Sequence, residues 1–386
     1  MDTRELIYLD NAATSFPKPC SVIDKMSDFM RYHGGNAGRG AHKLALDAAE
    51  AIYGCRERLC RLFDCDGPER VCFCSGATEA LNIAVKGLIR RGDHVLISDL
   101  EHNAVWRPIA KLAAEGRITY DLFPSFATDP KRSASRICTA IARLKKPNTR
   151  MLVCTHLSNV CSCVMPIAEI GELCQRYGIF FVVDGAQSAG HLPISVEKMH
   201  VDALCIPSHK GLWGPQGCGA VIWGSEVGRV ETLTEGGSGY RSLDPEMPKD
   251  TPERFEAGTL PTPAIAGLSA GIEELGRIGI DNVSAHIDQL HTRALDILSK
   301  NPKIRIIAPH LIGSVMLLCA EGVSPDQLGN ALDRRGICTR SGYHCAPLAH
   351  QTLQTPEGGA LRVSFGYFNS NEDVDALCAA LRDILK

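Results

Sequence analysis

Short apolar runs along the chain alternate with longer segments in which apolar residues recur every three or four positions. An apolar run predicts a buried strand, because parallel strands covered on both faces are apolar throughout. The longer segments predict helices, since residues at this spacing share one helix face. Strands are predicted at 71–74, 95–98, 151–155, 180–183, 203–206 and 220–223, and helices at 78–88, 104–114, 134–144 and 167–177.

This alternation ends near residue 225, and the chain then changes character. Residues 236–263 are rich in glycine, proline and charge and predict an irregular crossing. We therefore expect an α/β fold with a mostly parallel central sheet flanked by helices in residues 1–262, and a smaller α+β domain in residues 263–386. The smaller domain is predicted from helices at 264–276, 282–298, 325–334 and 371–385 and strands at 305–307, 314–319 and 361–365.

The composition is that of a globular protein, with 45% hydrophobic and 22% charged residues in a chain of 386. Such a chain has enough apolar surface for a large core, which argues against disorder. The formal net charge of −3, without a long basic run, argues against nucleic acid as a partner, because phosphate backbones require clustered Lys and Arg. No apolar signal core or membrane-spanning stretch is evident, so we expect a cytoplasmic protein without a membrane partner.

The chain contains 17 cysteines, which are scattered through predicted helices and strands. This distribution differs from the disulfide framework of a small secreted protein and predicts mostly reduced, buried thiols. Cys72 and Cys74 are two positions apart, as are Cys161 and Cys163, whereas zinc knuckles have two to four residues between ligands. No metal site is predicted, and packing on one strand face explains the first pair.

A lysine and an aspartate follow or end two of the predicted strands. Asp184 closes the apolar run 179–183, and Lys210 follows the strand at 203–206. Ligands of open α/β sheets bind beyond the carboxyl ends of strands. A lysine can hold an aldehyde cofactor as a Schiff base, and an aspartate can keep the ring nitrogen of that cofactor protonated. Pyridoxal 5′-phosphate uses both partners, although Asp184 alone could be an ordinary loop-initiating residue.

The residues after the strand at 71–74 predict a phosphate site. Ser75-Gly76-Ala77-Thr78 opens the helix that follows. A helix N-terminus offers free N–H groups and a partial positive charge, to which Thr78 would add a hydroxyl. A simple helix cap is the alternative, because Ser and Thr favour that position.

Two further polar residues follow predicted strands. His102, beyond the strand at 95–98, could stack its imidazole on a cofactor ring, although a helix cap at Asn103 explains this segment equally well. Asn159 follows the strand at 151–155. Polar groups after several strands of one sheet suit a single flat, phosphorylated cofactor.

Cys345 lies on a loop near the C-terminal end of the chain. Gly342 gives this loop conformational freedom, and the neighbouring Arg340 and His344 could favour the thiolate. Reactive cysteines occur in exposed, electropositive surroundings of this kind. A nucleophilic thiol combined with pyridoxal chemistry suggests an enzyme that moves sulfur.

These segments occur in the order found in a known family. The chain resembles the cysteine desulfurases of the class V aminotransferase type, especially the branch with a short Arg-x-Gly-x-His-Cys-Ala loop, and it is nearly as similar to selenocysteine lyases. The resemblance extends over almost the whole chain and implies the type I fold of pyridoxal-phosphate enzymes. The residues concerned are Tyr8-Leu9-Asp10-Asn11-Ala12-Ala13, Ser75-Gly76-Ala77-Thr78-Glu79-Ala80, Glu101-His102-Asn103, Ser158-Asn159-Val160, Asp184-Gly185-Ala186-Gln187, His209-Lys210, Phe255-Glu256-Ala257-Gly258-Thr259 and Arg340 to Ala346.

The resemblance implies a role for each residue around the cofactor ring. Lys210 would form the Schiff base, Asp184 would face the pyridinium nitrogen, and His102 would stack on the ring. Gln187 and Asn159 would lie near the ring oxygen, with Asn159 also close to the substrate.

The resemblance also implies the phosphate ligands. They would be Thr78 with the neighbouring amides of Gly76 and Ala77, His209, and Thr259 from a second subunit, so a homodimer follows. The family has Ser or Thr three residues before the lysine, where this chain has Pro207. Either one phosphate contact is lost, or Ser208 replaces it. A further departure is Cys161-Ser162-Cys163, where related enzymes commonly have Gly and Thr; buried packing is the simplest interpretation.

The substrate residues are implied in the same way. Arg362, at the strand 361–365, would bind the substrate carboxylate through its guanidinium fork. Arg340 and Ala13 belong to segments that would contact the substrate, and Arg39 lies in a segment resembling one that lines the entrance.

The leading hypothesis is therefore conversion of L-cysteine to L-alanine with pyridoxal phosphate. Lys210 would act as base and Cys345 would take the sulfur as a persulfide. An acceptor protein, such as an iron–sulfur cluster assembly protein, would receive the sulfur next. Lysis of L-selenocysteine is the alternative, followed by transamination and by a non-catalytic scaffold, for which Pro207 is the only sequence feature.

Overall fold

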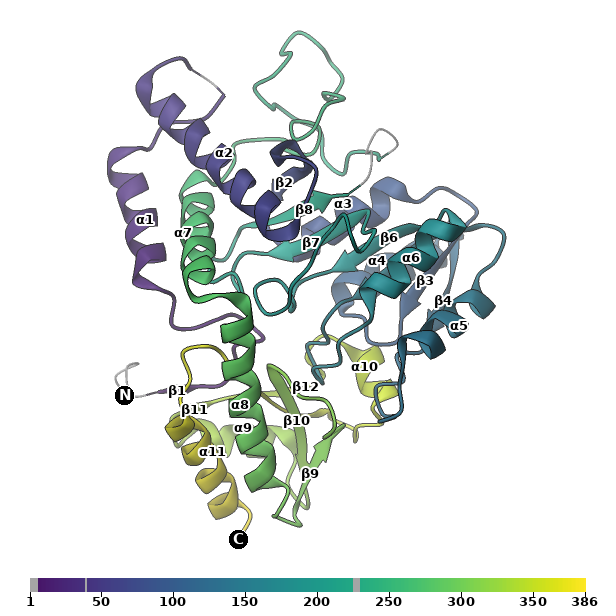
Figure 1. Cartoon of the computed structure of the whole chain (residues 1–386), viewed down its shortest axis with the longest axis vertical. Coiled ribbons are helices and arrows are strands. Elements are labelled where there is room, and N and C mark those ends of the chain that lie inside the picture. The colour runs from purple at the N-terminus through teal and green to yellow at the C-terminus, as the bar shows by residue number, and fades with distance from the viewer. Residues whose placement is uncertain (1–5, 39, 225–229) are drawn as a thin grey trace.

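The computed structural model describes residues 6–38, 40–224 and 230–386 and is built around a seven-stranded sheet in the order β2-β8-β7-β6-β5-β3-β4 (Figure 1). Neighbouring strands from β7 to β4 are parallel, whereas β8 is antiparallel to both β7 and β2. The sheet is therefore mostly parallel, as predicted. Its strands are β2 (Val71–Cys74), β3 (Asp93–Ser98), β4 (Ile118–Phe123), β5 (Thr149–Thr155), β6 (Phe180–Asp184), β7 (Ala203–Pro207) and β8 (Gly219–Trp223).

Helices cover both faces of this sheet, because successive side chains of its strands point to opposite faces. Val95 and Ile97 of β3 pack in one apolar cluster with α3 (Ala77–Leu88) and α4 (Asn103–Ala114), whereas Leu96 packs in the other. That second cluster includes side chains of α2 (Lys43–Phe63), α5 (Ala134–Leu144), α6 (Ile167–Tyr177) and α7 (Thr262–Ile278). A further helix, α1 (Cys20–Tyr32), packs against α7, and the short η2 (Pro68–Arg70) precedes β2.

The C-terminal part contains a separate four-stranded antiparallel sheet in the order β12-β13-β10-β9. Its strands are β9 (Ile304–Ile307), β10 (Val315–Ala320), β12 (Arg340–Gly342) and β13 (Ala360–Ser364), and its helices are α8 (Ile280–Leu298), α9 (Pro325–Asp333), α10 (Pro347–Thr352) and α11 (Asn371–Ile384). This arrangement matches the α+β character expected from the sequence. The long helices α8 and α11 pack against each other, and α7 leads into α8 (Figure 1).

The N-terminal segment crosses from one sheet to the other. Strand β1 (Ile7–Tyr8) pairs in parallel with β11 (Ile337–Cys338), and Asp10 forms an isolated bridge with Ser364 of β13. The predicted domain boundary at 262/263 falls at the start of α7, which packs on α1 and α2. Residues 7–10 are thus bound to strands β11 and β13 of the C-terminal part, contacts that no local pattern predicts.

The structure contains elements that the pattern did not indicate. Strand β4 is at the edge of the sheet and half-exposed, so its sequence lacks a continuous apolar run. The predicted packing of Cys72 and Cys74 is confirmed, because both lie against the cluster that contains α3. Residues 236–261 form neither helix nor strand, as expected for the irregular crossing.

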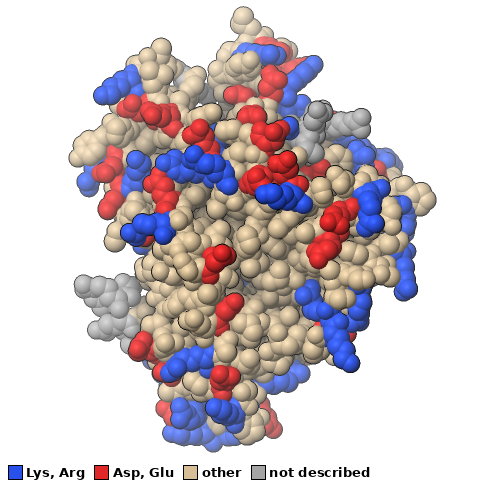
Figure 2. Space-filling view, in the orientation of Figure 1, with Lys and Arg blue, Asp and Glu red and all other residues tan. Residues whose placement is uncertain are grey.

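The surface carries both signs of charge. Acidic and basic side chains are interspersed over the face in Figure 2, and a band across its middle carries few of either. A phosphate backbone requires a continuous basic surface, which this face does not offer. In the part of the chain that the structure describes, no helix combines the length and apolar character needed to cross a membrane.

Candidate active site

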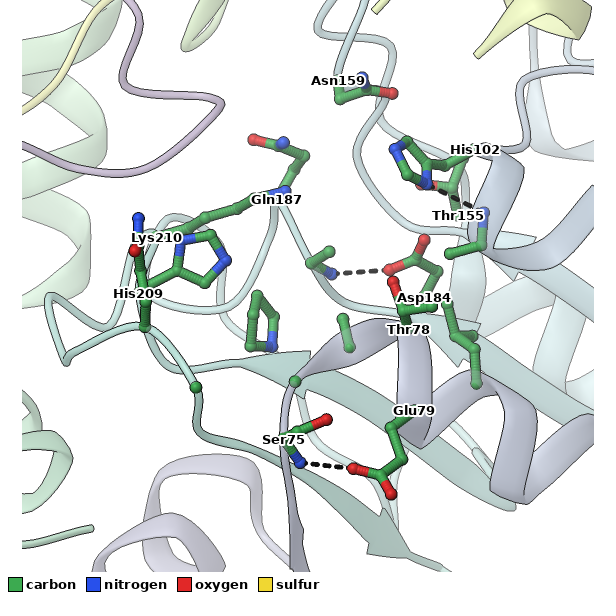
Figure 3. A pocket seen from close by; sticks show the side chains of 18 residues that line it. Ser75, Thr78, Glu79, His102, Thr155, Asn159, Asp184, Gln187, His209 and Lys210 are labelled. Atoms are coloured by element: carbon green, nitrogen blue, oxygen red, sulfur yellow. Dashed lines mark hydrogen bonds between the residues drawn. The ribbon is translucent and has the colours of Figure 1, made fainter. Parts of the chain in front are cut away.

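A cavity of about 380 Å³ lies at the carboxyl ends of the central strands. The chain leaves β2, β5, β6 and β7 at this edge, so the residues that follow these strands meet there (Figure 3). The structure brings many of the predicted site residues together in its walls. They are Gly76, Ala77, Thr78, His102, Asn159, Asp184, Gln187, His209 and Lys210.

Lys210 projects into the cavity from the loop after β7 (Figure 3). Burial lowers the pKa of its amine from 10.5 to about 8, because the charged form loses solvation. The negative charge of Asp184 opposes this effect, whereas Arg362 and Arg340 add to it. A substantial fraction of Lys210 is therefore the neutral, nucleophilic amine near pH 8.

The loop that bears Lys210 is held by the N-terminal segment. The carbonyl oxygen of His209 accepts hydrogen bonds from Thr14 Oγ1 at 3.0 Å and Lys18 Nζ at 2.8 Å. The hydroxyl of Ser15 donates to the carbonyl oxygen of Lys210 at 2.9 Å. These contacts fix the backbone on either side of the amine-bearing side chain. Sequence reasoning did not identify them, because the partners are almost 200 residues apart.

Asp184 is the last residue of β6 and is buried in the floor of the cavity. One of its carboxylate oxygens accepts a hydrogen bond from the amide of Ala186 at 2.9 Å. Burial raises the pKa of this carboxyl, and the Ala186 amide and Lys210 partly counteract the rise. The ionised form of a carboxylate that is buried in this way is stabilised most by a cationic partner inside the cavity.

The N-terminus of α3 forms another wall of the cavity. Its cap residue is Gly76, and among the described residues no side chain caps the helix. The predicted alternative, a cap by Ser or Thr, is therefore wrong for this helix. A Cβ added at Gly76 would meet no heavy atom within 4 Å, so this residue opens into free space. The exposed amides and the positive end of the helix suit an anion such as a phosphate.

His102 is itself the N-cap of α4, so a cap at Asn103 is not needed. Its Nδ1 accepts a hydrogen bond from the amide of Ala104 at 3.0 Å, which assigns the ring proton to Nε2. Burial, followed by the nearby charge of Lys210, lowers the pKa of His102 to about 4. The imidazole is thus neutral at physiological pH and lies with its ring in the cavity wall.

Two amide side chains complete the wall. Gln187 donates from Nε2 to the carbonyl oxygen of Ala12 at 2.9 Å. Asn159 donates from Nδ2 to the carbonyl oxygen of His344 at 2.9 Å. Asn159 thus connects the strand ends of the central sheet to the loop that carries Cys345.

Two predicted phosphate ligands lie elsewhere in this chain. Ser208 does not line the cavity, because its buried hydroxyl donates to the carbonyl oxygen of Pro215. Pro207 does line it, without a hydroxyl to offer. Thr259 is exposed and lies within 3.4 Å of the Asn36 side chain, away from the cavity walls of its own chain.

Cys345 is exposed at the margin of the cavity, outside its lining residues. The guanidinium of Arg340 lies 3.5 Å from its sulfur, as the expected electropositive neighbour. The amide of Asn103 donates to the carbonyl oxygen of Cys345 at 2.7 Å, directly beside His102. A thiolate at Cys345 is close enough to raise the pKa of Lys210, so the two side chains share one electrostatic environment.

His344 does not supply a charge to this thiol. Its side chain is buried, with Nδ1 at 3.0 Å from Nε2 of His350 and Nε2 at 3.1 Å from the carbonyl oxygen of Arg340. Burial lowers its pKa to about 3, so the imidazole is neutral. The expectation that His344 favours the thiolate is therefore wrong, and Arg340 remains as the cation in contact.

Arg362 is buried beside the cavity and already has partners. Its guanidinium donates to Asp10 Oδ1 at 2.6 Å and to the carbonyl oxygen of Asn159 at 3.2 Å. Its buried Nε has no partner among the described residues. Ala13 lies in the same N-terminal segment, in a turn with Asp10. Arg39 lies outside the described residues.

Glu101 is a buried residue of the site to which the sequence analysis assigned no role. Its Oε1 accepts a hydrogen bond from the amide of Thr155 at 2.7 Å and a second one from the hydroxyl of Ser98. Burial raises the pKa of this carboxyl to about 8. It ties the ends of β3 and β5 together through these two hydrogen bonds. Glu101 could have been identified from the sequence, because it belongs to the segment Glu101-His102-Asn103 that carries part of the family resemblance.

Comparisons with known proteins show the family to which the chain belongs. A model of the class V aminotransferase family matches residues 7–377. The chain belongs to the class V aminotransferase family. It is 32% identical over 391 residues to a probable cysteine desulfurase of Methanothermobacter thermautotrophicus, covering 99% of this chain and 95% of that protein. The resemblance to the cysteine desulfurase branch is therefore confirmed.

Two further similarities define the extent of the match. A cysteine desulfurase of Synechococcus elongatus is 33% identical over 393 residues, and the match covers 99% of this chain but 61% of that longer protein. The apo structure of a cysteine desulfurase from Thermococcus onnurineus superposes with a TM-score of 0.89 at 28% identity, covering 99% of this chain and 95% of the other. The predicted type I fold is confirmed by this agreement over the whole chain.

Proposed function

We propose that the protein is a pyridoxal-phosphate-dependent cysteine desulfurase that converts L-cysteine to L-alanine. The main support is one juxtaposition: Lys210 and Asp184 line the same cavity, and the exposed thiol of Cys345 lies at its margin. Transamination would make use of the lysine and the aspartate but not of the thiol. The full-length similarity to cysteine desulfurases supports the same choice.

The residues of the cavity fit pyridoxal phosphate. The uncapped α3 N-terminus at Gly76 would hold the phosphate, together with His209, whose buried Nδ1 has no partner in the described part of the chain. Asp184 would face the ring nitrogen, and His102 would cover the ring. When bound, the cofactor would accept the electron pair left on the substrate Cα.

The chain's own residues would then perform the remaining steps. Arg362 would bind the substrate carboxylate, and its Asp10 partner would keep the guanidinium oriented. The neutral amine of Lys210 would remove the Cα proton. The Cys345 thiolate would attack the substrate Sγ, so that a new S–S bond forms as the substrate Cβ–Sγ bond breaks. The products are a persulfide on Cys345 and, after protonation, alanine.

We further propose a homodimer in which Thr259 reaches the cavity of the second subunit. Thr259 is exposed and lies away from its own cavity. Exposed apolar side chains on the neighbouring helices α1 and α2 support burial in an interface. They are Ile23, Met30, Tyr32, Leu46 and Tyr53.

The exposed position of Cys345 also supports transfer of its sulfur to an acceptor protein, for example one that assembles iron–sulfur clusters. A reduced compartment such as the cytoplasm suits a chain whose 17 cysteines, all within the described residues, are free thiols.

The proposed function can be tested by locating the transferred sulfur. After incubation with L-cysteine, mass spectrometry of the peptides should find one added sulfur on the peptide containing Cys345. The variant Cys345→Ala should bind the cofactor, keep its yellow colour and form no alanine. Cys20→Ala, a change at another exposed cysteine, is the control and should retain activity. Alanine formation by Cys345→Ala at the parental rate would contradict the assignment. A much larger kcat/KM for L-selenocysteine would favour the lyase instead.

A further inference from the structure

Two buried histidines lie beneath the loop that carries Cys345. His344 and His350 are 2% and 3% exposed, and their rings are 5.2 Å apart at an angle of 20°. His350 belongs to α10, whose Leu348 packs in the apolar cluster with α3 and α4. This pair has no part in the chemistry proposed above, so the burial of two polar side chains here requires another explanation.

When both rings are neutral, the hydrogen bonds of the pair have one consistent direction. His344 Nε2 faces the carbonyl oxygen of Arg340 at 3.1 Å, so this nitrogen must carry the proton. His344 Nδ1 is then an acceptor and must receive the proton of His350 Nε2 at 3.0 Å. His350 Nδ1 in turn accepts from the hydroxyl of Thr355 at 2.9 Å. The result is a directed chain from Thr355 through both imidazoles to the backbone of Arg340.

This series of hydrogen bonds lies beside a strained part of the backbone. His344 and Cys345 have φ angles of 52° and 56°, in the left-handed region that is unfavourable for a non-glycine residue. Two such residues in succession persist only where the surroundings hold them. Asn159 and Asn103 hold their carbonyl oxygens, and the His344 side chain is a further anchor, held in place by His350.

The two imidazoles are electrically neutral, in agreement with the direction of the hydrogen bonds described above. Burial lowers the pKa of His350 to about 4, and the positive charge of Arg362 adds to the effect. A second proton on His350 would make Nδ1 a donor to the Thr355 hydroxyl, whose own proton would then turn to the carbonyl oxygen of His350 at 3.5 Å. A neutral, directed chain is a rigid support, since each nitrogen has one partner and one role.

We propose that His350 is a positioning residue for Cys345: through its hydrogen bond to His344 it holds the nucleophilic thiol at the margin of the cavity. This inference rests on the proposed function only in naming Cys345 as the nucleophile. His350 itself is five residues from Cys345, and its imidazole contacts His344, Thr355 and the ring of Tyr343.

The decisive comparison is between two substitutions at the same position. His350→Phe keeps the ring volume but removes both hydrogen bonds. His350→Gln offers an amide N–H that can replace the donor to His344. We expect His350→Phe to lower kcat for alanine formation by about 10- to 100-fold, the effect of a misplaced reacting group, with little change in KM. His350→Gln should recover most of this loss. His310→Phe, at an exposed histidine, is the control.

Two further measurements separate positioning from general damage. Exchange of the Cα proton of L-alanine in deuterium oxide uses Lys210 but not Cys345, so His350→Phe should leave it unchanged. Amide hydrogen exchange and the alkylation rate of Cys345 in the cofactor-free protein should change, with faster amide exchange confined to residues 340–355. Parental kcat in His350→Phe, equal losses in the Phe and Gln variants, or parallel loss of Cα exchange would each overturn the proposal. If the parent forms no alanine, the proposed function fails, while the exchange and alkylation measurements still test His350.

Discussion

The cofactor cradle at the strand ends and the loop that carries Cys345 reach the same cavity by different means. The cradle, consisting of Gly76, His102, Asp184 and Lys210, is positioned by a parallel sheet that is buried on both faces. The cysteine loop is positioned by side-chain hydrogen bonds and contains two left-handed residues. A sheet tolerates the loss of one contact, whereas a loop held by few contacts does not. Substitutions in the two regions should therefore have different effects on two measurable steps, exchange of the Cα proton and transfer of the sulfur.

The largest effect should come from Lys210→Ala, which removes the reactive group of the cradle. We expect losses of about 10³-fold or more in both Cα-proton exchange of L-alanine and alanine formation from L-cysteine. Cys345→Ala should abolish only the second reaction. Lys300→Ala, at an exposed lysine, is the control for Lys210. Full Cα exchange in Lys210→Ala would remove the distinction between the two regions.

A smaller loss is expected for Asp184→Asn. This substitution removes the buried charge that would stabilise a protonated cofactor ring, and alanine formation should fall by about 10²-fold. Asp184 also raises the pKa of Lys210, so that pKa should move further below 8 in the variant. Measurement of the rate and of the Lys210 pKa tests whether the carboxylate affects both the cofactor ring and the lysine. An unchanged rate would exclude its role at the ring.

The pKa of Lys210 predicts a pH dependence of cofactor capture. Only the neutral amine attacks an aldehyde, and burial lowers the pKa to about 8. Capture of pyridoxal phosphate by the cofactor-free protein should therefore accelerate as the pH rises and level off above about 8. Arg340 lowers this pKa, so Arg340→Gln should move the midpoint to higher pH. Stopped-flow absorbance gives both midpoints; a midpoint near 10.5 in the parent would contradict the buried environment.

The smallest expected effect is one of stability, at a contact between the segment after β5 and strand β10 of the C-terminal sheet. Ser162 has a φ of 54°, and its hydroxyl accepts from Val315 N at 2.8 Å and donates to Val315 O at 3.0 Å. Ser162→Ala should lower the free energy of unfolding by about 1–3 kcal/mol, because it leaves buried backbone groups unpaired. Ser162→Gly should be about 1 kcal/mol less harmful, since glycine adopts this φ freely. Urea denaturation measures both; equal losses would argue against backbone strain at this position.

The sequence predicted the cradle better than the loop, for a physical reason. Apolar runs locate the strands, and the carboxyl ends of strands locate His102, Asp184 and Lys210. The orientation of Ser208 was not predictable, because it depends on a turn that brings Pro215 to its hydroxyl.

Contacts between segments that are distant along the chain could not be predicted from the sequence either. The pairing of Arg362 with Asp10 joins residues 352 positions apart, and no local pattern indicates it. The role of His344 was misjudged because adjacency to Cys345 in sequence does not show which way a side chain points. In the structure the imidazole faces His350 instead of the thiol.

The most direct test of the whole account is to find the residue that binds the cofactor covalently. The protein loaded with pyridoxal phosphate is reduced with borohydride, digested and mapped by mass spectrometry. The account predicts the reduced cofactor on the peptide that contains Lys210, the amine that lies in the cavity with Asp184 and His102. A stable label on any other lysine, or no label at all, would contradict it.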